Sequence, residues 1–295
     1  MTLHLQLGVL LAFASAMAAN FGFFYKYRGV QDTPRVPLSR PLRAVTILFT
    51  SPWFVLGVLV AIVGWALHVA ALWVAPMSVV QAALAVGVVF IAVLADRMFG
   101  FTVGRRQWCG LLLAAGGLLL LGATLPTVHG THAAFHGPTM VAFELVAGAA
   151  ALALMLAATF GAGSVGQQGV MLGASAGLLW GVSDTAIKAL TGIAEASGAG
   201  GVLASPLLAV SIVASFVALF ASARGLQLGE AVPVIAVTGT GANVAGILGG
   251  VIVFGDPVAG GPLGVAAQAL AFGLVVLAAF ILPAPVRSAH VVEPA

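Results

Sequence analysis

The stretch "SPWFVLGVLVAIVGWALHVAAL" covers residues 51–72, and His68 is its only ionisable side chain. About 20 apolar residues in a helix are enough to cross the hydrocarbon core of a bilayer. Runs of this kind fill most of the 295-residue chain, which is 61% hydrophobic and only 6% charged. Because a soluble domain carries about 25% charged residues, this composition predicts one integral membrane domain surrounded by a lipid bilayer. The runs are too long for barrel strands and do not alternate in polarity, so the predicted fold class is all-α.

Nine transmembrane helices are predicted, separated by short breaks rich in Gly, Pro and Ser. The predicted spans are residues 3–24, 52–75, 77–96, 107–125, 139–161, 168–191, 205–224, 231–254 and 263–283. The longest loop, residues 25–50, ends in "LRAVTILF", which is either a short interfacial helix within 36–50 or the remnant of a tenth span. The first span begins almost at Met1 with no basic region before it, so no cleaved signal peptide is expected. We expect the tail, residues 284–295, to be disordered, and the single cysteine, Cys109, to form no disulfide within the chain.

Basic residues predict the orientation of the chain. With nine spans, ten of the eleven basic side chains fall on one side, the exception being Lys188; the ten are Lys26, Arg28, Arg35, Arg40, Arg43, Arg97, Arg105, Arg106, Arg224 and Arg287. Because loops rich in Lys and Arg stay in the cytoplasm, we expect the amino terminus outside and the carboxyl terminus in the cytoplasm. The net charge of +3 follows from this topology and does not indicate nucleic-acid binding. The compact chain and its short loops favour a bacterial cytoplasmic membrane.

The two halves of the chain repeat each other in order, although their identity is low. "AANFGFFYK" (18–26) and "WGVSDTAIK" (180–188) both end a helix of small residues with a lysine, and the stretches that begin "SP" at Ser51 and Ser205 have similar lengths. The predicted arrangement is repeat 1 (1–125), a linking helix (139–161) and repeat 2 (168–283). An odd number of linking spans inverts the second repeat, and inverted repeats place a transporter's binding site between the halves.

These motifs resemble the drug/metabolite transporter superfamily of the EamA type, whose repeats open with a W-G helix that ends in lysine. "VFGD" (253–256) resembles the family's "LGE", and "YKYRG", "SPWF" and "APMSVV" in the first half resemble the NIPA-like magnesium-transporter branch. That branch carries "GExAN" in its second span, whereas this chain has "GWALH", with Trp65 in place of the Glu and His68 near the Asn. Mg²⁺ prefers carboxylate and other oxygen ligands, and only Glu144 and Asp184 are candidates within the spans. The departure argues against magnesium.

Asp184 and Lys188 are the most conspicuous candidates, because an ionisable residue in a span costs about 2.5–3.5 kcal/mol on insertion scales. They are four residues apart and share one helix face. In one interpretation they form a self-neutralising pair that lets the helix insert, with Lys188 reaching toward the outer interface. In the other, the pair lines a central cavity, where Lys188 attracts an anionic group or Asp184 takes up a proton.

Other candidates also have two interpretations. His68 either makes a hydrogen bond in the core or takes part in proton coupling, since histidine titrates near physiological pH. Trp65 either packs or stacks on a substrate, and Glu144 is expected to be an interfacial, solvated acid. The glycines of "TGTGANVAGILGG" (238–250) either permit close helix contact or let a helix bend. Polar side chains expected to bond across helices are Asn20, Gln81, Thr238, Thr240, Asn243 and Gln268.

The predicted substrate and coupling residues are Asp184, Lys188, His68, Trp65, Trp180, Asn20, Asn243 and Gln81. His129, His132 and His136 have metal-like spacing only in a helix, and their loop contains Gly130 and Pro138, so no metal site is predicted.

The function that we expect is a permease that moves a small-molecule substrate by alternating access, with protons as the candidate coupling ion. No catalytic residue and no cofactor are predicted, and the absence of a nucleotide-binding loop argues against direct use of ATP. The alternative is a NIPA-like magnesium transporter. A membrane-embedded enzyme acting on lipid is less favoured, because it needs a cluster of catalytic polar residues at one membrane face. The small-residue helix faces fit a monomer or a homodimer.

Overall fold

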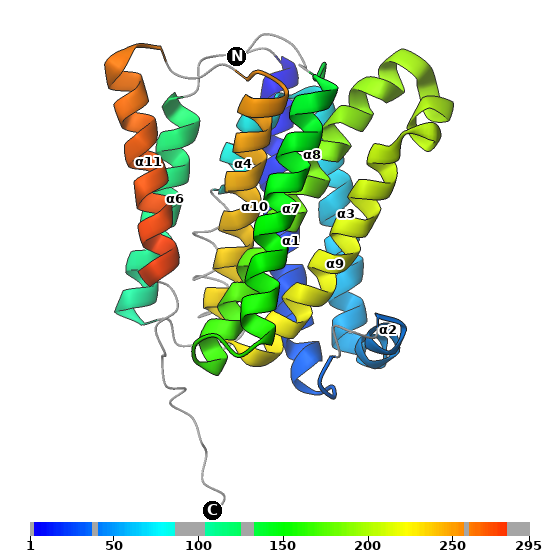
Figure 1. The fold of residues 1–295 in the computed structure, drawn as a ribbon, viewed down its shortest axis with the longest axis vertical. Helices are drawn as coiled ribbons and strands as arrows, with labels where there is room; N and C mark the ends of the chain where they lie inside the picture. The colour runs from blue at the N-terminus through cyan, green and yellow to red at the C-terminus, as the bar shows by residue number, and fades with distance from the viewer. Residues whose placement is uncertain (1–2, 37–40, 86–103, 125–132, 257–259, 282–295) are drawn as a thin grey trace, which may run out of the picture.

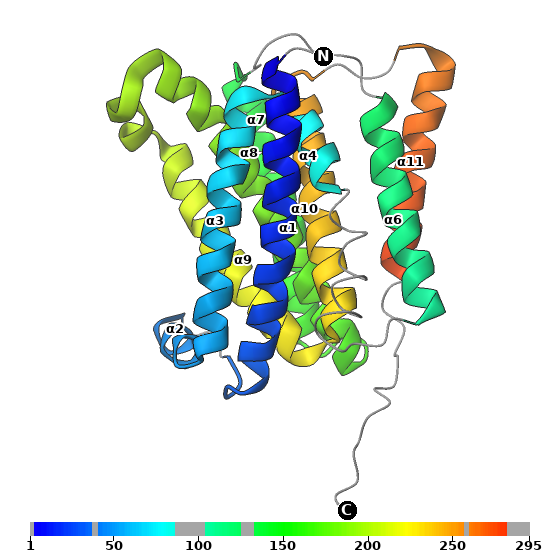
Figure 2. The ribbon, with the colours of Figure 1, turned by 180° about the vertical axis from the view of Figure 1, so that it is seen from behind.

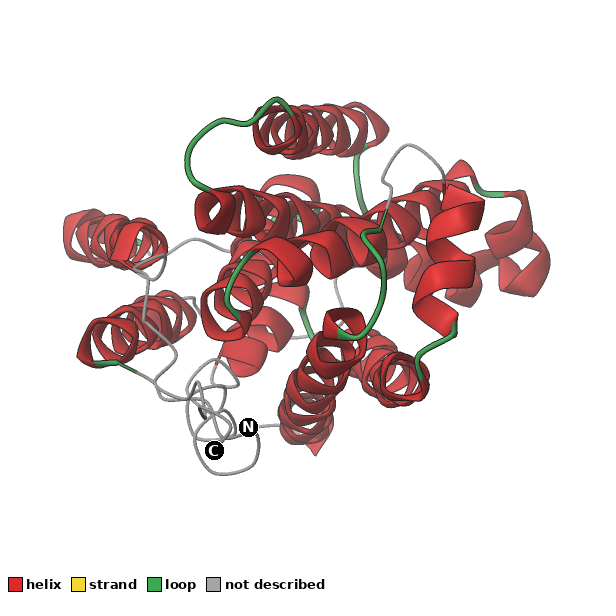
Figure 3. Cartoon of the chain, turned by 90° about the horizontal axis from the view of Figure 1, so that it is seen from below, coloured by secondary structure: helices red, strands yellow, loops and turns green. Residues whose placement is uncertain are grey.

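The computed structural model describes residues 3–36, 41–85, 104–124, 133–256 and 260–281. Within these ranges the chain folds into helices joined by short connections, without strands, as the all-α prediction requires. The long helices run roughly along one axis (Figure 1), and a view from below shows several of them nearly end-on (Figure 3). The helices are α1 (Leu3–Gln31), α2 (Pro41–Phe49), α3 (Pro52–Val74), α4 (Met77–Ala85), α6 (Arg105–Thr124), α7 (Gly137–Thr159), α8 (Val165–Ala204), α9 (Pro206–Leu228), α10 (Ala231–Val253) and α11 (Gly261–Ile281).

Six of the described helices are long and apolar enough to cross a membrane, namely α1, α3, α7, α8, α9 and α10. This confirms that the chain has the helices of a membrane protein, while the count of nine spans stays a prediction. The predicted span 77–96 begins in α4 and continues into residues outside the described ranges.

Helix bounds differ from the predicted spans at three places. α1 continues to Gln31, seven residues beyond the predicted end at position 24. α8 is 40 residues long and contains Gly198 with φ of 66°, so two helical segments meet there at a kink. "LRAVTILF" lies in α2, whose nine residues span about 14 Å at 1.5 Å per residue. This helix is too short to cross a bilayer, which agrees with the interfacial interpretation.

The "SP" pairs at corresponding points of the two halves both begin a helix, with the serine as its N-cap. Ser51 caps α3 by accepting the backbone N–H of Phe54, and Ser205 caps α9 by accepting that of Leu207. In each helix the proline takes the first helical position, where a missing N–H costs no hydrogen bond. The sequence similarity therefore corresponds to two similar helix starts.

Small residues bring neighbouring helices into backbone contact. On α8, Gly173, Gly177 and Gly181 recur every four residues and face α10; a Cβ on Gly177 would lie 2.5 Å from the Thr238 carbonyl oxygen. On the α10 side, a Cβ on Gly246 would lie 2.6 Å from the Gln81 side chain. The glycines of "TGTGANVAGILGG" thus permit close helix contact, the first of the two predicted roles.

The helices form two packed groups. α1 packs mainly against α3, and α8 packs against α9, α10 and α7, while α4 contacts both α1 and, more closely, α10. α6 and α11 pack against each other at one side of the bundle in both Figure 1 and Figure 2. One large apolar cluster includes Phe24, Phe54 and Leu226 toward the end where α1 terminates, and a second includes Leu72 and Met77 toward the other end. The candidate site lies between these clusters.

Candidate functional site

A cavity of about 480 Å³ separates the two groups of helices. α1, α3 and α4 line it from the first half of the chain, and α8, α9 and α10 line it from the second. Its volume is within the range of pockets that hold small molecules. Seven of the eight predicted site residues line it, namely Asn20, Trp65, His68, Gln81, Trp180, Asp184 and Asn243.

The Asp184 carboxylate joins the two halves at one end of the cavity, here called the aspartate end. Its Oδ2 accepts a hydrogen bond of 3.1 Å from Nε2 of Gln81, and its Oδ1 lies 3.1 Å from Nε2 of His68. His68 is on α3, Gln81 on α4 and Asp184 on α8, and all three side chains are buried. The hydrogen bond from Gln81 and the close approach of His68 thus both bring a side chain of the first half to an acceptor in the second. A buried carboxylate needs such donors, because an unpaired charge away from water is costly.

Lys188 does not pair with Asp184, so the predicted self-neutralising pair is wrong. Within the described part of the chain, its ammonium group instead donates to the carbonyl oxygens of Leu72 at 2.7 Å and Ala75 at 3.1 Å. The two carbonyls belong to the end of α3, where Pro76 interrupts the chain and the last carbonyls have no partner within the helix. Lys188 has 0% exposure and is not in the cavity wall. It does not reach the outer interface, and a place in the cavity is also wrong for this residue.

Trp180 and Gln81 each have a side-chain polar atom without a hydrogen-bond partner among the described residues. The indole N–H of Trp180 and the side-chain oxygen of Gln81 are buried and have no hydrogen-bond partner among the described residues. Both side chains line the cavity. A ligand at the aspartate end can therefore meet one donor and one acceptor without displacing a bond of the protein.

Two further polar predictions have clear outcomes. The Thr238 hydroxyl lies 3.0 Å from the Gly173 carbonyl oxygen on α8 and 2.8 Å from the Val234 carbonyl oxygen on its own helix, so the predicted interhelical bond is confirmed. Glu144 on α7 is partly buried, not fully solvated, and one of its carboxylate oxygens is buried without a partner among the described residues. It does not line the cavity.

Lys26 is a cavity residue that sequence reasoning missed. It is only 4% exposed and lines the cavity at the end away from Asp184, here called the lysine end. Its Nζ lies 4.0 Å from the centroid of the Phe23 ring, a cation–π contact. No hydrogen bond or ion pair links its ammonium group to another residue in the described ranges. The signal was available, since the matched repeats align Lys26 with Lys188, but ending the first span at position 24 assigned Lys26 to a loop.

The two ends of the cavity are well separated. A Cβ on Gly57 would lie 2.7 Å from Cγ of Lys26, so this point of α3 marks the lysine end. His68 follows Gly57 by eleven residues on the same helix, a rise of about 16 Å. The cavity therefore extends along α3, with Lys26 at one end and the single carboxylate of Asp184 at the other.

The cavity opens sideways between α3 and α9. Trp65 and Ile62 on α3, and Phe216 and Ile212 on α9, line the cavity and yet have large exposed fractions, 50% for Trp65 and 52% for Phe216. α3 packs on α1 and α9 packs on α8, so these two helices form the edges of the two groups. This face of the bundle is the one that lipid would cover.

Below the lysine end, the two groups of helices are tied together. Gln31 at the end of α1 donates a 3.0 Å hydrogen bond to the Leu226 carbonyl oxygen on α9. In return, Gln227 donates to the carbonyl oxygens of Val30 at 3.3 Å and Pro34 at 3.1 Å. These bonds tie the end of α1 to the end of α9.

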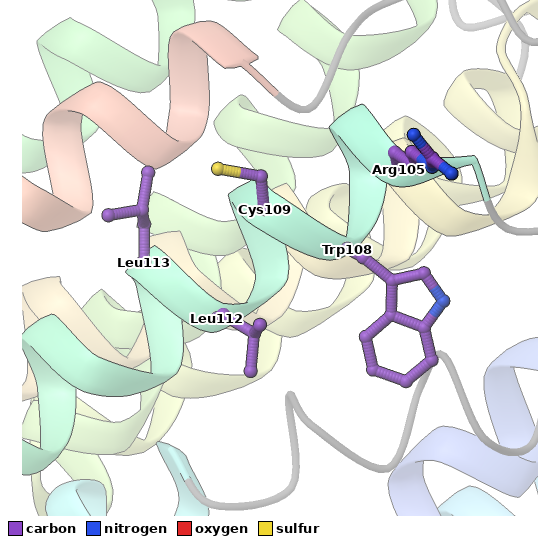
Figure 4. A pocket seen from close by; sticks show the side chains of 5 residues that line it. All are labelled: Arg105, Trp108, Cys109, Leu112 and Leu113. Atoms are coloured by element: carbon purple, nitrogen blue, oxygen red, sulfur yellow. The ribbon is translucent and has the colours of Figure 1, made fainter.

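A second hollow has no comparable chemistry. Figure 4 shows it along α6, and its lining residues Arg105, Trp108, Cys109, Leu112 and Leu113 all come from that one helix. It contains none of the predicted site residues, so we assign it no function.

The described residues contain no group of three His, Cys, Asp or Glu side chains that could hold a metal ion. His129 and His132 lie outside those residues, and His136 is exposed at the start of α7. Comparisons with protein families, with curated proteins and with solved structures found no match to this chain.

Proposed function

We propose that the chain is a secondary transporter that moves a small organic solute across a membrane by alternating access. The observation that carries the proposal is the cavity between the two groups of helices, with Asp184 hydrogen-bonded across it to Gln81 and 3.1 Å from Nε2 of His68. Bonds that cross between the halves can break when one half moves against the other, and a transporter needs contacts of that kind. The resemblance of the helix-opening motifs to the drug/metabolite transporter superfamily agrees with this proposal.

Two features support an inverted-repeat arrangement. α1 and α8, which carry the matched motifs, run in opposite directions along the bundle (Figure 1). In each half the helix with the lysine packs most closely on the helix that begins with "SP", α1 on α3 and α8 on α9. The proposed orientation puts the end of α1, with Arg28, and the start of α6, with Arg105, in the cytoplasm, in a bacterial inner membrane.

Proton coupling is proposed for the Asp184 cluster. When Asp184 is ionised, it attracts both donors, and when it is protonated, it holds them less tightly. Nε2 of His68 lies 3.1 Å from the carboxylate, so His68 is placed to exchange a proton with it. Proton binding would then loosen the contact between α8 and the α3–α4 pair.

The two alternative functions have less support from the same observations. A magnesium site usually needs more than one carboxylate or several carbonyl oxygens, and Asp184 is the one acidic residue among the described residues that line the cavity. A lipid-modifying enzyme needs its polar cluster at a membrane face. Here Asp184, His68 and Gln81 are buried between the helix groups.

The test is uptake by proteoliposomes of a ligand first found by thermal-shift screening of the purified protein. We expect Asp184→Asn to lower the initial uptake rate about tenfold or more, which corresponds to about 1.4 kcal/mol. Glu144→Gln is the matched control, because it neutralises another acid within a span that does not line the cavity, and it should transport normally. Full uptake by Asp184→Asn, or ligands that bind but are never transported, would contradict the proposal.

A further inference from the structure

We propose that the lysine end of the cavity binds the acidic group of a singly charged organic anion whose apolar body lies between α3 and α9. This inference deepens the proposed transport function and rests on the same cavity. The observations behind it are the ammonium group of Lys26, which has no ion-pair or hydrogen-bond partner among the described residues, the apolar cavity wall and the side opening.

Lys26 carries the inference because its charge is buried without an acid among the described residues. Lysine is almost never fully buried unless it is paired, yet Lys26 is 4% exposed, and its ammonium group contacts the Phe23 ring without an ion pair or hydrogen bond in the described part of the chain. Its side chain lies against α3 at Gly57 and reaches the cavity. A ligand carboxylate can supply the missing counter-charge there.

The cavity wall next to Lys26 indicates that the part of the ligand beyond its acidic group is apolar. Phe23, Val58, Leu219 and Ile235 line the cavity toward this end. Such a wall suits an apolar ligand body, because burial of apolar surface is favourable and needs no partner atoms. The side opening at Trp65 and Phe216 gives this body a route into lipid.

The net charge of the ligand is inferred from the charged side chains that line the cavity. Lys26 is the one lysine or arginine among the described residues that line the cavity. Asp184 already accepts a hydrogen bond from Gln81 and lies 3.1 Å from Nε2 of His68, so a ligand cation would have to compete with both side chains. One unpaired cation fits a monoanion, whereas a dianion such as a phosphate monoester would leave one charge uncompensated.

The first experiment uses the unmodified protein in nanodiscs of zwitterionic phosphatidylcholine. Three probes share a four-carbon chain with a terminal phenyl ring and differ only in the oxidation level and substituent of the C1 atom: 4-phenylbutyrate, 4-phenylbutan-1-ol and 4-phenylbutylamine. We expect calorimetry to give 4-phenylbutyrate an affinity about tenfold or more above that of the other two, a difference of about 1.4 kcal/mol. Equal affinities, or tighter binding of the amine, would overturn the inference.

Variants then test whether the preference comes from Lys26. Lys26→Met should abolish the preference for 4-phenylbutyrate while leaving the affinity of 4-phenylbutan-1-ol unchanged, and Lys26→Arg should retain the preference. Arg28→Met is the matched control: it removes a cation two residues away on the same helix, one that stacks on Trp53 at 3.9 Å and does not line the cavity. If Arg28→Met loses the preference as fully as Lys26→Met, general surface attraction is the cause and the inference fails.

A chemical test needs no variant and decides the matter if Lys26→Met fails to fold. Lys26 and Lys188 are the only lysines in the chain, so reductive methylation with formaldehyde, read by mass spectrometry, follows two side chains. We expect Lys26 to be methylated, saturating 4-phenylbutyrate to slow that reaction, and 4-phenylbutan-1-ol at equal occupancy to slow it much less. Equal protection by both probes would show that the charge is not bound at Lys26.

The inference and the proposed function can fail separately. Binding of 4-phenylbutyrate at Lys26 without transport of any ligand would remove the proposed function and keep the anion site. Transport of a cation that depends on Asp184 and ignores Lys26 would keep the function and remove the anion site.

Discussion

Lys26 and Lys188 end corresponding stretches in the two halves of the chain. Among the described residues, only Lys188 has hydrogen-bond acceptors for its ammonium group. Lys188 is fully buried and bonds two carbonyl oxygens at the end of α3, whereas Lys26 reaches the cavity with no acceptor among the described residues. The difference shows that one residue type in a repeated motif can hold the fold in one half and remain free for a ligand in the other. Stability measurements on variants at the two positions test this contrast directly.

The largest effect is expected for Lys188→Met. The substitution leaves the carbonyl oxygens of Leu72 and Ala75 buried without a donor, and each such loss costs about 1–3 kcal/mol. We therefore expect the free energy of unfolding, measured by SDS titration in mixed micelles, to fall by about 3 kcal/mol. The folded fraction should still bind 4-phenylbutyrate normally. Unchanged stability together with lost binding would reverse the roles assigned to the two lysines.

A double-mutant cycle measures the contact that joins the halves at the aspartate end. For His68→Ala and Asp184→Ala we expect a coupling energy of about 2 kcal/mol, within the range for residues in direct contact. The parallel cycle of Lys188→Ala and Asp184→Ala should give a clearly smaller coupling, because these residues share no bond. A larger value in the second cycle would restore the pair expected from their four-residue spacing.

Lys26→Met should act on stability with the opposite sign to Lys188→Met. Replacing an uncompensated buried cation by an apolar side chain of similar length removes a desolvation penalty, so we expect the free energy of unfolding to rise by about 1 kcal/mol. The same SDS titration checks this value, with Arg28→Met as the control for charge at that end of α1. A loss of stability would mean that Lys26 has a structural partner, and its availability to a ligand would then be in doubt.

Hydropathy predicted the helices well because a span needs only length and apolar composition. The predicted starts of α3, α7, α9 and α10 lie within two residues of the observed ones. It failed at the end of α1, since a charged residue was taken as the end of the span although the helix continues past Lys26 to Gln31. The error at α8 has a similar cause: polar and small residues beyond position 191 hid 13 more helical residues.

The residue types of the site were predictable, but their partners were not. Polar side chains within apolar spans are energetically costly and usually functional. This made three residues conspicuous in the sequence, namely Asp184, His68 and Gln81. The carbonyl oxygens that bind Lys188 belong to Leu72 and Ala75, more than 110 residues away in the sequence, and backbone acceptors leave no trace in residue identity. The four-residue spacing of Asp184 and Lys188 favoured a local pair, whereas the end of α3 before Pro76 provided a stronger site for the ammonium group.

The side opening between α3 and α9 makes the lipid phase a reservoir for the cavity. An amphipathic acid then arrives at a rate set by its partition coefficient, and each added CH₂ raises its concentration in lipid about fourfold, from about 0.8 kcal/mol per buried CH₂. From 3-phenylpropionate to 6-phenylhexanoate, the association rate should climb by this factor per CH₂ when referred to the aqueous concentration. It should stay level when referred to the concentration in lipid. A rate that ignores chain length would mean that the acid enters from water.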